Sequence, residues 1–169
     1  MPEPQKRRTR SLPEHPAVYV SWFDAVWLSR RLGKTLQLPD EWEWQQAATG
    51  GSDENVFPWG ADWDAKREPY RANTFESRLW QATAVGMYPA GASPGDILDM
   101  TGTVWEWCSN KFDQPDVIRS LADDFDIRVL RGGSWYVIRG LARSAFRDRP
   151  SPSHRDDKRH SSSPTTVAA

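Results

Sequence analysis

Residues 100–108 read MTGTVWEWC and residues 128–135 read RVLRGGSW, and these two segments decide the fold. Each joins glycines, which permit tight turns, to a short run rich in β-branched and aromatic residues. We therefore predict short strands at residues 104–108 and 129–130. Glu106 lies between two tryptophans, where an acid serves either as a general acid with a raised pKa or as a ligand and hydrogen-bond anchor.

Working outward, two helix starts are visible. Ser21 with Asp24, and Asp40 with Glu43, have the spacing of capping boxes, and glycines further along should end both helices. Residues 52–101 carry prolines, glycines and aspartates without sustained periodicity, which predicts long loops packed around the tryptophans Trp59, Trp63 and Trp80. Two short helices, short strands and much irregular structure indicate an α+β fold.

The composition points to one domain with an aromatic core. Ten tryptophans in 169 residues predict a core of wide rings rather than of long helices. The single cysteine excludes an internal disulfide and favours a reducing compartment. No apolar run is long enough to cross a bilayer, so we expect a cytoplasmic protein with no membrane partner.

Charge is distributed unevenly along the chain. The net charge is −1, but basic residues cluster at residues 1–10 and 128–160, leaving an acidic body. Arginine clusters favour phosphate, so a nucleic-acid-binding tail is one alternative, and it predicts an affinity that falls steeply with added salt. Aspartates interrupt the arginine-rich region, and we therefore expect no nucleic-acid partner.

Further motifs, in order, extend the pattern: HPAVYVSWFDAVWLSRRLGK (15–34), LPDEWEWQQAATGG (38–51), FPWG (57–60), ANTFES (72–77) and VGMYPAGASP (85–94). With the two opening segments they resemble the formylglycine-generating (sulfatase-modifying factor) family, which implies a C-type-lectin-like fold over residues 15–157. The first and last strands usual in that family have no counterpart here. Residues 1–14 read as a disordered basic arm and residues 158–169 as a mobile tail.

The resemblance does not bring the family's oxidative chemistry with it. The family's oxidase holds copper(I) with two cysteines, whereas this chain has only Cys108, in the WEWC segment, so we expect no copper. Related iron-dependent enzymes use three histidines on a helical domain, and His15, His154 and His160 lack that spacing. We therefore expect a non-catalytic binding module; the alternative is a formylglycine-generating oxidase or a truncated relative of one.

The family also holds calcium near its GNVWEW motif. Carried over to this sequence, the resemblance implies a calcium site at Asn73, Thr74, Gly102, Thr103, Val104 and Glu106. Thr103 stands where the family usually has asparagine, which weakens one oxygen ligand of an ion that needs six to eight.

Residues 136–157, YVIRGLARSAFRDRPSPSHRDD, have an unusual composition. They contain no lysine, glutamate, glutamine, methionine or tryptophan, and every residue type present has a codon ending in a pyrimidine. This segment resembles the variable region of diversity-generating retroelement proteins, which share the fold; the alternative is an ordinary arginine-rich loop. We expect a protein ligand, contacted by Tyr136, Val137, Ile138, Arg139, Phe146, Asp148, Pro150, Ser151, Pro152, Ser153 and His154.

Overall fold

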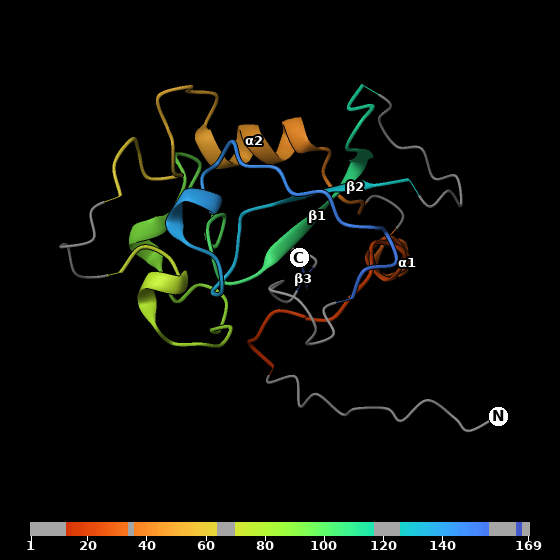
Figure 1. The fold of residues 1–169 in the computed structure, drawn as a ribbon, viewed down its shortest axis with the longest axis horizontal. Helices are drawn as coiled ribbons and strands as arrows, with labels where there is room; N and C mark the ends of the chain where they lie inside the picture. Colours follow the sequence, from red (N-terminus) through yellow and green to blue (C-terminus); the bar gives the residue numbers. More distant parts are fainter. Residues whose placement is uncertain (1–12, 34–35, 64–69, 117–125, 156–164, 167–169) are drawn as a thin grey trace.

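The fold was analysed in a computed structural model that describes residues 13–33, 36–63, 70–116, 126–155 and 165–166. Most of the predicted arm at residues 1–14, and most of the tail at residues 158–169, lie outside these ranges. The described elements (Figure 1) are the helices α1 (Trp22–Leu32) and α2 (Glu41–Thr49), the 3-10 turns η1 (Phe75–Ser77), η2 (Pro89–Gly91) and η3 (Arg139–Leu141), and the strands β1 (Trp105–Lys111), β2 (Arg128–Arg131) and β3 (Thr165–Thr166).

Both helices begin at the predicted capping boxes. The Asp24 backbone N–H donates to Ser21 Oγ at 3.2 Å, and the Ser21 N–H donates back to Asp24 Oδ2 at 2.7 Å. At α2, Asp40 Oδ1 accepts from the N–H of Glu43 at 2.8 Å, and Glu43 accepts from the Asp40 N–H at 2.9 Å. Gly50 ends α2 at φ 62°, a left-handed conformation that suits glycine. The helix predictions are confirmed.

The sheet has the order β2-β1-β3. β1 pairs with β2 antiparallel, with Trp107 opposite Leu130, and the strands predicted from the two opening segments are confirmed. β3 pairs with β1 in parallel through Trp105 and Thr165. This strand was not predicted, since residues 158–169 read as a tail without strand signals.

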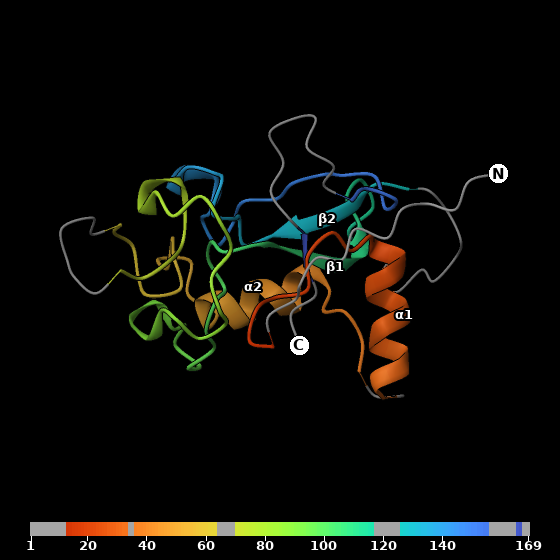
Figure 2. The same ribbon diagram turned by 90° about the horizontal axis from the view of Figure 1, so that it is seen from below.

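Alternation along β1 sends side chains to two helices. Trp105 and Trp107 pack with Trp22 of α1, whereas Cys108 packs with Trp44 of α2. Figure 2 shows α2 running along the sheet and α1 standing at one end of it. Arg128 on β2 is fully buried with its guanidinium 4.0 Å from the Trp22 ring centre, which ties β2 to the start of α1.

The long loops pack around aromatic rings, as predicted for two of the three tryptophans. Trp59 stacks on Phe57 with a centroid distance of 5.3 Å, and Trp63 lies 5.0 Å from the same ring. Trp80, which we expected to pin the loops from inside, instead lies at the surface against the edge of Phe75, with ring centroids 5.0 Å apart.

Glu41, the first residue of α2, joins four parts of the chain in one buried network. Its backbone N–H donates to Asn110 Oδ1 at 2.9 Å, and its Oε1 accepts from Asn110 Nδ2 at 2.8 Å. Its Oε2 lies 2.5 Å from Arg147 Nε and 3.6 Å from Arg131 Nη1. Glu41 is only 1% exposed and Arg131 3%, so this pair is almost without water, whereas the Arg147 side chain is 31% exposed. The network fixes α2 to β1, β2 and the segment after η3.

Replacing Glu41 by glutamine should strongly destabilise the domain. The variant keeps the side-chain shape but leaves two guanidinium groups without their counter-charge, and breaking a buried pair in this way costs about 3 kcal/mol or more. Urea unfolding at neutral pH measures the loss, and Glu54→Gln, on an exposed side chain, is the matched control. Equal stability of the two variants would show that the network is not needed.

Candidate functional site

The predicted ligand segment begins next to the η1 turn. The Phe75 N–H donates to the Val137 carbonyl at 3.0 Å, and the Arg139 N–H donates to Glu76 Oε1 at 3.0 Å. Figure 1 shows the two turns side by side, η1 in lime and η3 in blue, and Figure 2 shows the same adjacency. Residues 75–80 and 136–139 therefore form one surface, which we call the η1–η3 face.

Large apolar side chains are exposed on this face. Tyr136 is 43% exposed, Ile138 54%, Phe75 42% and Trp80 51%. Exposed aromatic residues gathered in one place mark interaction sites more often than scattered ones do. Phe75 and Trp80 were not among the predicted ligand contacts, because an aromatic residue in a loop is typical of a packed core. The one feature of the sequence that pointed to this surface was Phe75 in the ANTFES motif, an aromatic residue in a loop rich in polar residues.

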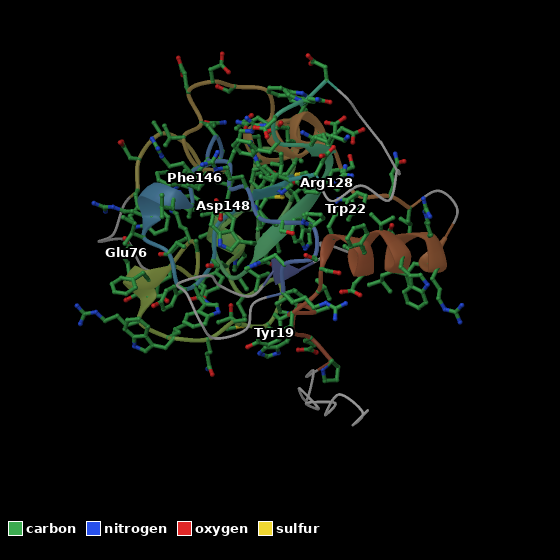
Figure 3. All side chains as sticks on the ribbon, turned by 45° about the vertical axis from the view of Figure 1, so that its right-hand side comes forward. Tyr19, Trp22, Glu76, Arg128, Phe146 and Asp148 are labelled. Carbon is green, nitrogen blue, oxygen red and sulfur yellow. The ribbon has the colours of Figure 1, made fainter. Side chains whose placement is uncertain are left out.

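The later part of the predicted ligand segment is bound to the scaffold. Phe146 packs against the core with its ring 6.0 Å from that of Trp105. The backbone of Asp148 exchanges two hydrogen bonds of 3.0 Å with Leu130. Figure 3 shows Phe146 and Asp148 between Glu76 on one side and Trp22 with Arg128 on the other. These two residues hold the segment to the sheet.

The end of the segment lies against α1. Pro152 is buried and its carbonyl accepts the Trp22 N–H at 3.0 Å, and the Pro150 carbonyl accepts the Arg128 N–H at 3.3 Å. The structure thus buries Pro152, which we predicted to contact a ligand, because this part of the chain packs against the first turn of α1. Of the remaining predicted contacts, Ser151 and Ser153 are exposed and Val137 and His154 are half-buried.

Glu106 faces α2 from β1. Trp44 Nε1 donates to its Oε2 at 2.6 Å, and Glu106 is buried, with 7% of its surface exposed. Burial raises the pKa of Glu106 to about 7; the hydrogen bond from Trp44 opposes this shift and the charge of Asp99 adds to it. The geometry suits a hydrogen-bond anchor for the α2 tryptophan.

The oxygens that the resemblance assigns to calcium already accept hydrogen bonds. The backbone carbonyls of Asn73 and Thr103 accept the N–H groups of Thr103 and Trp135 from other segments, and the Gly102 carbonyl accepts the N–H of Val104 within the same turn. Asn73 Oδ1 accepts from Ser77 Oγ at 2.7 Å. Among the described residues no group of three or more His, Cys, Asp or Glu side chains converges on a metal position. Each of these oxygens has a second lone pair, so the hydrogen bonds do not exclude an ion, and the calcium site stays a prediction.

The backbone explains the residues of the motif around position 102. Gly102 has φ 78°, and a Cβ on it would lie 2.3 Å from the Asn73 carbonyl oxygen, so only glycine fits. Thr103 follows at φ 58°, a left-handed conformation that asparagine tolerates and β-branched residues avoid. The asparagine usual in the family at this position is therefore favoured by the turn itself, whatever it binds.

Cys108 does not fit a copper site. It is 0% exposed on the α2 side of β1, and burial raises the pKa of its thiol well above the usual value. A buried thiol with a raised pKa is a poor thiolate ligand, and the chain has no second cysteine to complete a pair.

Comparison with known proteins gives the family. Residues 1–159 match the family described as sulfatase-modifying factor enzyme 1-like domain. The chain belongs to this family. The bovine protein "Inactive C-alpha-formylglycine-generating enzyme 2" is 36% identical over 131 residues, which cover 72% of this chain and 39% of that protein. "Hercynine oxygenase" of Mycolicibacterium thermoresistibile is 35% identical over 160 residues, covering 85% of this chain and 34% of that protein.

The chain spans between about a third and two fifths of the length of these two relatives. Among solved structures, PvdO from Pseudomonas aeruginosa superposes with a TM-score of 0.69 at 24% identity, over 85% of this chain and 59% of that one. Treponema denticola variable protein 1 superposes with a TM-score of 0.67 at 19% identity, over 91% of this chain and 70% of that one. The formylglycine-generating type of C-type-lectin-like fold is thereby confirmed. Among the described residues, no helix is long and apolar enough for a membrane span.

The raised pKa of Glu106 predicts a pH-dependent stability. The carboxyl group has a pKa of about 7 in the folded state, against an ordinary value of 4.5, so the folded state binds an extra proton between these two pH values. Stability therefore falls as pH rises through this window. Glu106→Gln keeps an acceptor for Trp44 but does not titrate. Its unfolding free energy relative to wild type should rise by about 2 kcal/mol between about pH 5 and about pH 8.

Chemical denaturation at several pH values measures this difference. Glu54→Gln serves again as the control and should follow the wild-type curve. A constant difference between wild type and Glu106→Gln across the range would mean that Glu106 titrates normally in the folded protein.

Proposed function

We propose that this domain is a non-catalytic binding module that recognises a protein through the η1–η3 face, inside the cytoplasm. The observation that carries the proposal is the exposure of Tyr136, Ile138, Phe75 and Trp80 on two neighbouring segments. One backbone hydrogen bond and one bond to the Glu76 carboxylate join these segments. Tyrosine, tryptophan and arginine are the residues that contribute most to protein–protein affinity.

In this segment the backbone makes the contacts with the scaffold, and most side chains point to the surface. Hydrogen bonds from the Val137 carbonyl and the Arg139 N–H hold the backbone of this segment in place. The side chains of Tyr136, Ile138 and Arg139 are exposed and do not belong to the core. Val137 alone in this run packs against the core cluster that contains Trp105 and Trp107. A rigid backbone with outward side chains lowers the ordering cost of binding.

Two comparisons support a binding role over a catalytic one. The bovine relative is named an inactive enzyme, and a solved structure with the same fold is named a variable protein. The oxidase alternative requires two cysteines, and Cys108 is the only one in the sequence. The resemblance to retroelement variable regions fits best where the segment is exposed, at residues 136–139.

Removing the aromatic rings of the face should weaken partner binding. A partner captured by the wild-type domain and then purified should bind Trp80→Ser/Tyr136→Ser at least about tenfold more weakly, since hot-spot aromatics contribute more than about 1 kcal/mol each. Biolayer interferometry gives the dissociation constants.

The control is Trp42→Ser/Tyr70→Ser, which removes the same two residue types from positions that are 56% and 55% exposed. This control should bind within about twofold of wild type, a difference of less than about 0.5 kcal/mol. Equal loss in both double variants, or in neither, would contradict the η1–η3 face as the binding surface.

The diversification hypothesis makes a separate prediction at the level of the gene. Deep sequencing in a growing culture should find substitutions within codons 136–157 at positions that are adenine in a near-identical template nearby, beside a reverse transcriptase gene. Codons for Tyr136, Ile138 and Arg139 should vary most in this segment, since these side chains are exposed, whereas the codon for buried Pro152 should vary least. If codons 136–157 are invariant and no template is found, the diversification hypothesis is wrong. The proposal that the η1–η3 face binds a protein would not be affected by that result.

A further inference from the structure

The η1–η3 face carries positive charge beside its aromatic rings. Arg78 ends the η1 turn and Arg139 begins the η3 turn, and both residues are exposed. Arg143, which is also exposed, follows η3, and its Nε donates to the Gly140 carbonyl at 2.8 Å. Three arginines therefore lie on or beside this face of a protein whose net charge is −1.

Glu76, the only acidic residue of the η1–η3 face, is engaged by contacts within the protein. Its Oε1 and Oε2 accept the Arg139 N–H at 3.0 and 3.2 Å, and Oε2 also accepts from Thr74 Oγ1 at 2.8 Å. Within the described part of the chain, neither Arg78 nor Arg139 forms an ion pair through its guanidinium group. Two positive charges of the face are therefore left for a partner.

The backbone holds Arg78 and Trp80 in an unusual conformation. Their φ angles are 55° and 57°, in the left-handed region that residues with large side chains rarely adopt. The Arg78 N–H donates to the Phe75 carbonyl at 3.2 Å and closes the turn. Backbone of this kind costs energy and is concentrated at functional sites. The strained turn presents a guanidinium group and an indole ring on either side of Leu79, which is 47% exposed.

Aliphatic side chains distinguish this surface from a nucleic-acid site. Leu79 and Ile138 are exposed on the face, and Leu141 is exposed at the end of η3. Single-stranded nucleic acids are bound by cationic groups and by flat aromatic rings on which the bases stack, and branched aliphatic chains offer no such plane. The Glu76 carboxylate would also repel phosphate groups. Arginine and aromatic side chains together with apolar ones are typical of surfaces that bind proteins.

We propose that the η1–η3 face binds an acidic segment of a protein partner, an inference that rests on the function proposed above. Carboxylates of that segment pair with Arg78 and Arg139, and its apolar side chains pack against the rings of Trp80 and Tyr136. Guanidinium groups pair with carboxylates through two parallel hydrogen bonds, so they fix the orientation of the segment as well as its charge. Arg78 lies outside residues 136–157, so the preference for acidic partners does not depend entirely on the segment predicted to vary.

Selection from a phage library of random short peptides tests this inference on the whole chain. Peptides enriched on wild type but not on Trp80→Ser/Tyr136→Ser bind the η1–η3 face. These peptides should be more acidic than the unselected library by about two charges, one for each guanidinium group without an ion pair.

The strongest binder is then synthesised together with an analogue in which amides replace all of its carboxylates. At about 50 mM salt, where screening is weak, wild type should bind the acidic peptide about tenfold more tightly than the amide analogue. Arg78→Gln/Arg139→Gln should bind the two peptides with affinities within about twofold of one another, because the groups that distinguish them are gone. Fluorescence anisotropy gives the dissociation constants.

The matched control is Arg30→Gln/Arg31→Gln, which removes two exposed arginines from α1, on the opposite side of the molecule from η1 and η3 in Figure 1. This variant has the same net charge as Arg78→Gln/Arg139→Gln and should keep the preference of wild type. An equal loss of preference in both variants would show that net charge alone decides binding, and would overturn the proposal.

The remaining outcomes separate this inference from the function on which it rests. If no peptide is enriched on wild type over Trp80→Ser/Tyr136→Ser, the η1–η3 face does not bind protein and both proposals are wrong. Enriched peptides without an acidic bias, or an unchanged preference in Arg78→Gln/Arg139→Gln, would overturn the acidic partner and keep the binding face. Binding of an oligothymidylate of about 20 nucleotides that depends on Trp80 and Tyr136 would overturn both in favour of nucleic acid.

Discussion

The buried carboxylate of Glu41 is the constraint on which the rest of the structure depends. It belongs to the first turn of α2, yet its partners Asn110, Arg131 and Arg147 come from β1, β2 and the segment after η3. Burying a charge is costly unless every partner is in place, so these four pieces of chain can pack only in one arrangement. In a larger sheet, the register of the strands fixes how the segments lie relative to one another. Here the strands are short, and the contacts of Glu41 fix these positions instead.

The network also explains how a small sheet carries two different faces. β1 directs Trp105 and Trp107 towards α1 and Cys108 towards α2, so aromatic packing and the polar network occupy opposite sides. On the α2 side Arg131 makes both kinds of contact: its guanidinium lies 4.9 Å from the Trp44 ring centre and pairs with Glu41. The proposed binding surface, the η1–η3 face, lies on loops outside this sheet.

Local signals in the sequence predicted local structure well. Capping pairs such as Ser21 with Asp24 are read within four residues, and both helices start where the pairs are. Long-range features left no such signal. Glu41 looks like an ordinary acid in a first helical turn, and nothing near it indicates arginines a hundred residues away. The same holds for Pro152, whose burial depends on α1, and for the pairing of β3 with β1.

The two hydrogen bonds that hold η3 against η1 involve only the backbone of the later segment: the Val137 carbonyl and the Arg139 N–H. Neither bond depends on which side chain stands at position 137 or 139, provided that residue 139 is not proline. The path of the chain therefore does not depend on the exposed side chains at positions 136, 138 and 139, and mutation can change these while the fold is kept. Val137 is the exception in this run, because it packs against the core. Such a surface can change its specificity in single steps, each of them compatible with a folded protein.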